Sequence, residues 1–163
     1  MEKIFFYENT PVGKLCIGER EGAITRVTWQ QLPKEWVLEE TELIRKCKQE
    51  LDEFFEGKRK TFDLPLAPAG TAFQKKVWDA LREIPYGETK TYKDIAIAVD
   101  SPKGFRAVGM ANNKNPIAII VPCHRVIGSN GKLVGYAAGM ETKTFLLALE
   151  QQERPFQVEK KLV

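Results

Sequence analysis

Short apolar runs occupy most of the first thirty positions of the chain. They cover residues 4–7, 14–18 and 23–29, and the turn-prone segments 9–13 and 18–22 separate them. Apolar or alternating runs of this length, bounded by Gly, Pro and Asn, are typical of strands that are joined in hairpins. We therefore predict a small antiparallel sheet at the N-terminus.

A helical pattern follows this sheet. Apolar side chains recur at steps of three and four from Ile44 to Phe54, and Gly57 stands where such a helix is expected to end. The segment 62–70 contains two prolines and a glycine, which predict an extended connection between domains. We expect an N-terminal α/β scaffold domain at residues 1–65 and a second domain at residues 70–163.

Three helices are predicted in quick succession after this connection. They cover about 71–84, 91–99 and 103–113, with a capping box at Thr71 and with Ser101-Pro102 at the start of the third. The last two helices, joined by a tight turn, predict a helix-turn-helix unit. On spacing alone, a pair of core-packing helices is the more common explanation. The predicted fold class is α/β, with a small N-terminal antiparallel sheet plus helix and a mainly helical C-terminal domain.

The composition excludes several classes of protein. The chain is 43% hydrophobic and 29% charged, which is typical of a folded chain rather than a disordered one. No apolar stretch approaches the ~20 residues of a membrane span, and the first residues lack a secretory signal pattern. Three cysteines and one histidine are too few for a disulfide framework or a structural zinc site. We expect a cytoplasmic protein that binds neither a metal nor a membrane.

Positive charge is concentrated in the middle of the chain. Residues 72–132 carry ten basic and five acidic side chains, whereas the net charge of the whole chain is only +3. A basic segment that includes a helix-turn-helix pattern favours a polyanion as partner. Ordinary solvation of the surface is the alternative, and charge alone does not separate the two.

The single histidine of the chain, His124, directly follows Cys123. A thiol with a pKa near ~8.5 is mostly protonated at neutral pH, and an imidazole that accepts its proton makes the nucleophilic thiolate available. Arg125 adds a positive charge beside them. A third group must orient the imidazole, and Glu150 is the candidate. The alternative is a buried structural cysteine beside a surface histidine.

Two further elements are predicted around this dipeptide. Asn130-Gly131, between two apolar triplets, is a strong hairpin-turn signal. A final helix at about 140–152 is expected to turn Phe145, Leu146 and Leu149 inward.

In this context the sequence resembles the O6-alkylguanine-DNA alkyltransferases, a family also called methylated-DNA–protein-cysteine methyltransferases. The resemblance is dense over residues 71–151 and holds only in outline before them. The motif Pro-Cys-His-Arg-Val is highly specific in this setting. The matching segments are 84–88, 91–92, 105–109, 115–116, 122–126, 136–139, Lys143 and 146–150.

The resemblance implies direct repair of DNA by a single, irreversible transfer. Cys123 would take the alkyl group from O6 of a guanine flipped out of the duplex and keep it as a thioether. His124 would accept the thiol proton through a water, and Glu150 would hold His124. Tyr92 would donate to N3 of the departing base, and Asn115 would brace the turn that leads to the cysteine.

The resemblance also implies a DNA-binding surface and a substrate pocket. Arg106 would fill the space of the flipped base, although a phosphate contact is the simpler alternative. Small residues would let the second helix of the unit enter the minor groove. The full set of implied DNA-binding residues is Arg106, Ala107, Gly109, Ala111, Asn112, Asn113, Lys114 and Arg125. The implied pocket residues are Tyr136, Ala137, Val126 and Ala138, with the Cys123 and Val126 carbonyls receiving the guanine amino group.

Two positions depart from the family pattern: Ala138 and Met110 stand where many relatives have glycine. The expected partner is double-stranded DNA containing O6-alkylguanine, with no cofactor, and the protein is expected to be a monomer in the absence of DNA. Two other functions remain open. One is a lesion-binding protein without transfer activity, and the other is a cysteine hydrolase that uses Cys123, His124 and Glu150.

Overall fold

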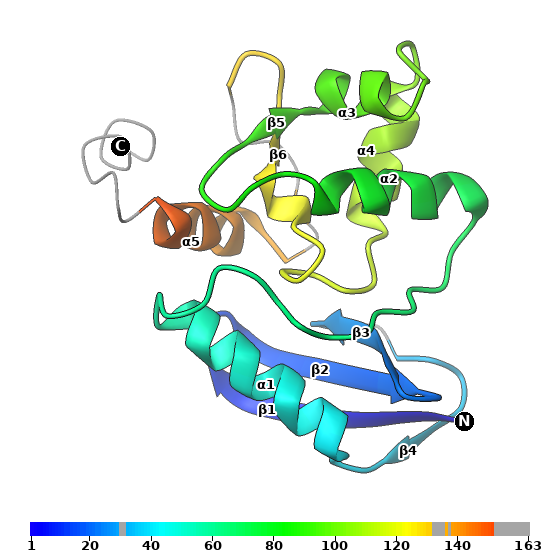
Figure 1. Ribbon diagram of the computed structural model, residues 1–163, viewed down its shortest axis with the longest axis vertical. Helices are drawn as coiled ribbons and strands as arrows, with labels where there is room; N and C mark the ends of the chain where they lie inside the picture. The colour runs from blue at the N-terminus through cyan, green and yellow to red at the C-terminus, as the bar shows by residue number, and fades with distance from the viewer. Residues whose placement is uncertain (30–31, 132–135, 137, 152–163) are drawn as a thin grey trace. The chain divides into compact units, whose positions relative to one another are not determined.

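The computed structural model describes residues 1–29, 32–131, 136 and 138–151, which form two units (Figure 1). The first unit comprises residues 1–69 and 116–120, and the second comprises residues 70–115 and those from 121 onward. The first is a sheet with a helix, and the second is mainly helical, so the predicted fold class is confirmed. No helix in the described residues is long and apolar enough to cross a membrane.

The first unit is built on a four-stranded sheet of order β3-β2-β1-β4. Its strands are β1 (Glu2–Thr10), β2 (Gly13–Arg20), β3 (Ala23–Thr28) and β4 (Trp36–Leu38). The first three are antiparallel neighbours, as predicted from the apolar runs. The sequence did not predict β4, which pairs parallel with β1, because three residues are too few to show a periodic pattern.

Helix α1 (Glu42–Phe55) lies across one face of this sheet (Figure 1). Its N-cap, Thr41, accepts a hydrogen bond from the Ile44 backbone nitrogen at 3.1 Å. The predicted apolar stripe from Ile44 to Phe54 is fully buried, and Cys47 is part of it. Gly57, with φ +76°, follows the helix as expected.

Two segments distant in sequence add to the edge of the sheet at β3. The Ile24 nitrogen donates to the Pro65 carbonyl at 2.8 Å, and the Val27 nitrogen donates to the Pro116 carbonyl at 2.9 Å. The expected connection 62–70 is therefore partly paired with β3. Residues 116–120 belong to the first unit, although they lie far beyond its predicted end. The apolar pattern of residues 116–120 does not indicate which strand they pair with.

The second unit contains four helices in its described residues, together with one 3-10 turn and a two-stranded parallel pair. The elements are α2 (Ala72–Arg82), β5 (Lys90–Thr91), α3 (Tyr92–Ala98), α4 (Phe105–Asn113), η1 (Cys123–Arg125), β6 (Val126–Ile127) and α5 (Met140–Glu150). The α2 capping box at Thr71 and Gln74 is present. The Trp78 indole nitrogen donates to the Ala111 carbonyl at 2.8 Å and so joins α2 to α4.

Three details of this unit differ from the sequence prediction or lie outside it. Helix α4 begins after Gly104 rather than at Ser101-Pro102, because residues 101–104 form a turn closed by a hydrogen bond from the Gly104 nitrogen to the Ser101 carbonyl. Phe145 is 37% exposed instead of turned inward, whereas Leu146 and Leu149 are buried. The second strand of the hairpin predicted at Asn130-Gly131 falls on 132–135, outside the described residues.

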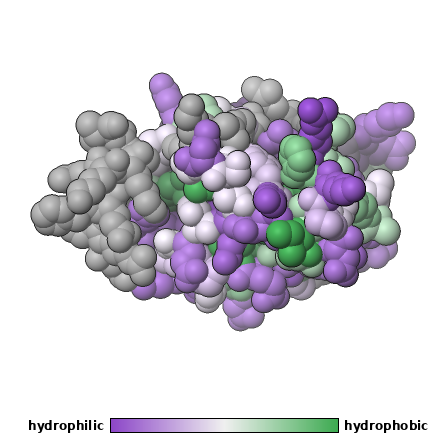
Figure 2. Space-filling view, turned by 90° about the horizontal axis from the view of Figure 1, so that it is seen from above, coloured by the Kyte–Doolittle hydropathy of each residue, from purple (hydrophilic) through white to green (hydrophobic). Residues whose placement is uncertain are grey.

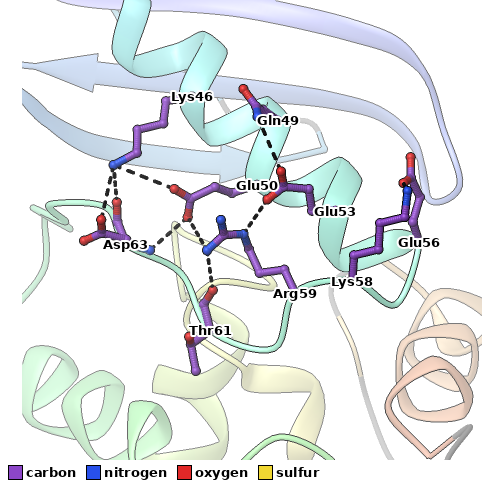
Figure 3. A network of polar contacts seen from close by, with 9 residues as sticks. All are labelled: Lys46, Gln49, Glu50, Glu53, Glu56, Lys58, Arg59, Thr61 and Asp63. Carbon is purple, nitrogen blue, oxygen red and sulfur yellow. Dashed lines mark hydrogen bonds and ion pairs between the residues drawn. The ribbon is translucent and has the colours of Figure 1, made fainter.

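A polar network fastens the end of α1 to the chain that follows it (Figure 3). Its centre is Glu50, a carboxylate that is 3% exposed. Glu50 accepts a hydrogen bond from the Asp63 nitrogen at 2.8 Å and lies 3.5 Å from the Arg59 guanidinium. Arg59 also pairs with Glu53 at 2.8 Å. The buried carboxylate therefore links α1 to a backbone donor and to a guanidinium of the segment that follows it.

We expect Glu50→Ala to lower the free energy of unfolding by about 1–3 kcal/mol, because it removes the charged acceptor of the Asp63 backbone N–H and one of the two carboxylates that pair with Arg59. Urea denaturation followed by circular dichroism measures this loss. Glu53→Ala, which removes a more exposed carboxylate from the same network, is the matched control and should cost less. Equal losses in the two variants would contradict the role given to burial.

Candidate active site

The chain turns sharply at the motif that contains Cys123. Cys123, His124 and Arg125 form the single 3-10 turn η1, in which the Arg125 nitrogen donates to the Pro122 carbonyl at 3.0 Å. All three side chains are buried, with His124 at 0% exposed. The alternative of a surface histidine is therefore wrong.

The Glu150 carboxylate, at the end of α5, holds two of these three residues. His124 Nε2 lies 2.6 Å from Glu150 Oε2. Arg125 donates from Nε to Oε1 at 2.8 Å and from a terminal nitrogen to Oε2 at 2.9 Å. A two-pronged guanidinium–carboxylate contact is the strongest ion-pair geometry available to these groups. The predicted pairing of Glu150 with His124 is thus present, and Arg125 shares the carboxylate.

Gly87 approaches Glu150 from the loop after α2. Its nitrogen donates to Glu150 Oε1 at 3.3 Å. Its φ is +82°, and a Cβ built at this position would lie 3.3 Å from the Glu150 carbonyl oxygen. Both the backbone conformation and the close approach favour glycine here.

The ionisation of this group follows from its contacts. Burial alone would raise the pKa of Glu150, but His124 and Arg125 outweigh it and hold the pKa at about 2. Burial lowers the pKa of His124, against the attraction of Glu150, so the imidazole is neutral near pH 7. A carboxylate only accepts, so His124 Nε2 carries the hydrogen. Nδ1 is then the acceptor, and it is buried without a hydrogen-bond partner among the described residues.

The Cys123 thiol lies in a setting that both opposes and assists its ionisation. Burial raises its pKa, while Asn115, Tyr136 and the charge of Lys143 act in the opposite direction. The Sγ–H group donates to the Tyr136 hydroxyl at 3.7 Å. Asn115 donates to the Val121 carbonyl at 2.9 Å and so braces the chain just before the cysteine.

Lys143 is a feature of this site that sequence reasoning did not assign a role. It is fully buried on α5, and Nζ donates to the Val126 carbonyl at 2.6 Å. Burial lowers its pKa to about 8, and Cys123 opposes that shift. The cation that favours the thiolate is therefore Lys143 rather than Arg125. The sequence did contain one indication of this role: Lys143 lies one turn before Leu147, on a helix face that is otherwise apolar.

Tyr92, the first residue of α3, is half-buried. Burial raises its pKa, and the proximity of Cys123 raises it further, so the hydroxyl keeps its proton near neutral pH. The N-cap Thr91 begins the helix with a capping box. A Cβ at Gly109 of α4 would lie 3.8 Å from the Tyr92 ring, an ordinary contact distance. Packing within the unit therefore does not require glycine at 109.

Helix α4 has one exposed and one buried face, and the implied DNA-binding residues divide between them. The exposed group comprises Arg106, Ala107, Asn113 and Lys114, with Gly109 partly exposed. Met110 is also exposed, at 68%, and so is Phe105, at 51%. Ala111 and Asn112 are buried, and the burial of Asn112 favours an internal role over the contact with the DNA backbone that the resemblance implied.

Arg125 also differs from the DNA-binding role that the resemblance implied. It is 6% exposed, and its guanidinium is taken up by Glu150 and by the Ile84 carbonyl at 2.7 Å. Its Cζ lies 5.7 Å from the centre of the Tyr86 ring. A buried cation with these partners supports the shape of the site and is not placed to meet a phosphate.

The implied pocket residues are only partly within the described chain. The Tyr136 hydroxyl contacts Cys123 Sγ, and the Ala138 carbonyl accepts a hydrogen bond from the Thr142 hydroxyl at 3.3 Å. Val126 is fully buried. Ala137 lies outside the described residues.

The face of the molecule drawn in Figure 2 is mixed in character. Over its described residues, apolar side chains form separate groups among hydrophilic ones. Apolar side chains scattered in this way are normal on the surface of a folded protein.

Comparison with known proteins agrees with this architecture over nearly the whole chain. Residues 4–68 match the model of the 6-O-methylguanine DNA methyltransferase ribonuclease-like domain, and residues 72–152 match that of the DNA binding domain of the same family. The chain therefore belongs to the 6-O-methylguanine DNA methyltransferase family.

Similar proteins carry a consistent name. The methylated-DNA–protein-cysteine methyltransferase of Methanosarcina barkeri is 49% identical over 148 residues, covering 87% of this chain and 93% of that protein. The constitutive methylated-DNA–protein-cysteine methyltransferase of Bacillus subtilis is 51% identical over 151 residues, covering 87% and 92%. The crystal structure of Mycobacterium tuberculosis OGT in complex with DNA aligns with a TM-score of 0.87 at 40% identity, covering 94% of this chain and 95% of that one.

The lowered pKa of Glu150 predicts a specific loss of stability in acid. Its folded-state pKa of about 2 lies below the ordinary value of 4.5, so its stabilising contribution is present above pH 4.5 and is lost as the pH falls toward 2. The difference corresponds to about 3 kcal/mol. Glu150→Gln should remove this contribution, which urea denaturation between pH 2 and pH 7 measures. Glu141→Gln, an exposed change on the same helix, controls for the loss of one charge. A pH dependence in Glu150→Gln equal to that of the natural chain would refute the assignment.

Proposed function

We propose that this chain repairs O6-alkylguanine in double-stranded DNA by transferring the alkyl group to Cys123 in one irreversible step. The observation that carries the proposal is a buried thiol beside an imidazole that a buried carboxylate orients. Membership of the 6-O-methylguanine DNA methyltransferase family supports it. No cofactor enters the reaction, because the acceptor of the alkyl group is the protein itself.

The proposed chemistry moves one proton and one alkyl group. The Cys123 proton passes to His124 Nδ1 through a water, and the sulfur electron pair forms a bond to the alkyl carbon. The bond between that carbon and O6 breaks, and its electron pair stays on the purine. Tyr92, held as a neutral phenol, donates to N3 of the departing base and offsets the charge that develops there. A thioether is not hydrolysed by water, so each molecule acts once.

The guanine must leave the base stack to meet a buried sulfur. The exposed face of α4 supports a role for this helix in the minor groove, where Arg106 would take the space of the flipped base. Small side chains at Ala107 and Gly109 allow a close approach to the duplex. Asn113 and Lys114, both exposed at the end of the helix, are proposed to contact the DNA backbone.

We propose different roles for the two predicted domains. We assign the DNA contacts and the alkyl acceptor to the domain at residues 70–163, and a scaffold role to residues 1–65. Tyr136, Val126 and Ala138 are proposed to line the pocket, together with Ala137. Because the substrate is DNA, we place the reaction inside the cell, in the cytoplasm. That the protein is a monomer without DNA stays a prediction.

The mass of the protein after reaction separates this function from its alternatives. Incubation with a duplex that contains O6-methylguanine should add one methylene to the protein, about 14 Da, and then stop. A lesion-binding protein would show no change in mass. A cysteine hydrolase would turn over repeatedly and would not depend on DNA.

Cys123→Ser should abolish the transfer while leaving the affinity for DNA within about twofold, because the exposed face of α4 is unchanged and only the nucleophile is weakened. Mass spectrometry measures the transfer, and fluorescence anisotropy measures the binding. Cys47→Ser, at a buried thiol of the other unit, is the matched control and should still accept the alkyl group. Transfer by Cys123→Ser would disprove the nucleophile assignment.

Arg106→Ala should weaken both DNA binding and repair, because it removes an exposed cation and the side chain proposed to replace the flipped base. A loss of about tenfold in the repair rate is expected, in line with 1–3 kcal/mol for such a contact. Arg20→Ala removes an exposed arginine of the first unit and should change neither measurement. If the two variants behaved alike, the role of Arg106 would be wrong.

A further inference from the structure

Ile119 has a main-chain conformation that its residue type disfavours. Its φ is +74°, in the left-handed region, and its side chain is 1% exposed. Two other non-glycine residues in the described part of the chain have a positive φ, Glu21 and Asp100, and both are exposed. Ile119 differs from them because it is buried and its Cβ is branched, and a branched residue in this region is a genuine outlier. It lies four positions before Cys123.

A hydrogen bond identifies the turn that this conformation makes. The Ile120 nitrogen donates to the Ala118 carbonyl at 2.8 Å, across Ile119. A bond between residues two apart, with a φ near +75° at the residue between them, defines the γ-turn of positive φ, which is rare and strained. The chain therefore reverses at Ile119 at a cost in free energy, which other contacts must offset.

A second turn of the same size leads directly into the cysteine. The Cys123 nitrogen donates to the Val121 carbonyl at 2.8 Å, and Pro122 between them has φ −81° and ψ 64°. These angles are those of the inverse γ-turn, which is a common, low-energy conformation. The strain in this segment therefore lies at Ile119.

Hydrogen bonds on both sides hold the chain in this path. Before the turn, the segment 116–118 makes two hydrogen bonds of 2.9 Å with the main chain of Val27. After it, the Val121 carbonyl accepts from Asn115 Nδ2 at 2.9 Å. An ordinary φ at Ile119 would direct the following residues elsewhere and break one of these contacts. The left-handed conformation is thus the one that satisfies both.

The side chain of Ile119 holds the turn in place. It belongs to the apolar run 117–121, in which every side chain is buried. A change to an ordinary conformation would redirect its Cβ and take an apolar side chain out of its packed position. Glycine would adopt the turn without strain, but it has no side chain to hold it there. Isoleucine therefore gives up some stability and fixes the geometry of the turn.

We propose that the left-handed turn at Ile119 is a positioning element for the reactive thiol. The proposal rests on the proposed function, since the reaction that it concerns is alkyl transfer to Cys123. The reversal at Ile119 and the turn at Pro122 together set the path of the main chain into η1, and so the place of Sγ. A small displacement of a reacting atom lowers the rate of a reaction strongly. Ile119 is thus a positioning residue that acts through Cys123.

The first test compares the stabilities of alanine and glycine variants at this position. Both Ile119→Ala and Ile119→Gly lose the buried side chain, but glycine alone of the two accepts a positive φ without strain. At an ordinary position alanine is the more stabilising residue. Here we expect the melting temperature of Ile119→Gly to lie about 2–4 °C above that of Ile119→Ala. Circular dichroism measures both temperatures.

The reaction rates of the same two variants should follow the same order. Without the buried side chain, alanine can leave the left-handed region and move the main chain before Cys123, whereas glycine keeps the turn. We expect Ile119→Ala to accept the methyl group of O6-methylguanine in a duplex about tenfold more slowly than Ile119→Gly. Their dissociation constants for that duplex should agree within about twofold, because the exposed face of α4 is unchanged.

Single-turnover rates are measured at 15 °C with a saturating excess of protein, and thermal denaturation confirms that each variant is folded at that temperature. A purely structural role would lower the melting temperature without changing the rate of the folded, saturated complex. The rate at saturation therefore separates positioning from stability.

Ile120 provides the matched control. It is the next isoleucine along the chain, it is 8% exposed, and it is not among the described residues with a positive φ. Ile120→Ala should therefore melt above Ile120→Gly and react at least as fast. Ile119→Val, which keeps the branched Cβ and most of the buried volume, is the second variant at the turn. It should react within about twofold of the natural chain.

The outcomes distinguish a failure of the inference from a failure of the function beneath it. The inference is overturned if Ile119→Ala melts above Ile119→Gly, or if the two variants react at the same rate. A rate for Ile119→Val as low as that of Ile119→Ala would also overturn it, because the buried volume would then govern the rate. A natural chain that accepts no methyl group from the duplex would refute the proposed function itself, and the melting temperatures would still test the strain at Ile119.

Discussion

The buried carboxylate of Glu150 is the contact on which the site depends. One side chain accepts from His124, from two nitrogens of Arg125 and from the backbone of Gly87. It thereby ties the end of α5 to the 3-10 turn η1 and to the loop after α2. A charge buried this deeply is tolerated only with such partners, since an unpaired carboxylate in the interior would be protonated instead. The same contacts fix which imidazole nitrogen carries the hydrogen.

The environment of Cys123 reflects a compromise between reactivity and protection. Burial keeps the thiol protonated and raises its pKa, which guards it against oxidation and adventitious reactions. Lys143, Tyr136 and Asn115 act in the opposite direction and lower this pKa, although burial remains the larger effect. Because Lys143 is itself buried and bound to the Val126 carbonyl, its charge acts at short range and through a medium that screens it weakly.

Much of this molecule was predictable from local pattern. The strands β1 to β3, the stripe on α1, the capping box at Thr71 and the pairing of His124 with Glu150 all follow from periodicity, capping chemistry and the presence of a single histidine. What escaped prediction depends on long-range packing. Neither the three-residue strand β4 nor the return of 116–120 to the edge of β3 has a local signal. The burial of Asn112 and Arg125 depends on which face of α4 or η1 turns inward. Because both residues are polar, their types predict exposure rather than burial.

Hydrogen bonds from two adjacent residues of α4 hold this helix against α2 and against the turn that contains Cys123. Asn112 reaches the Cys123 carbonyl, and the Ala111 carbonyl beside it receives the Trp78 indole. The helix is therefore fastened to α2 and to the reactive turn by adjacent residues. Any shift of α4 would change the position of the main chain that carries the nucleophile. The opposite face of α4 is exposed and carries the basic residues Arg106 and Lys114, so the proposed docking of a duplex there would involve the same helix that holds the cysteine turn.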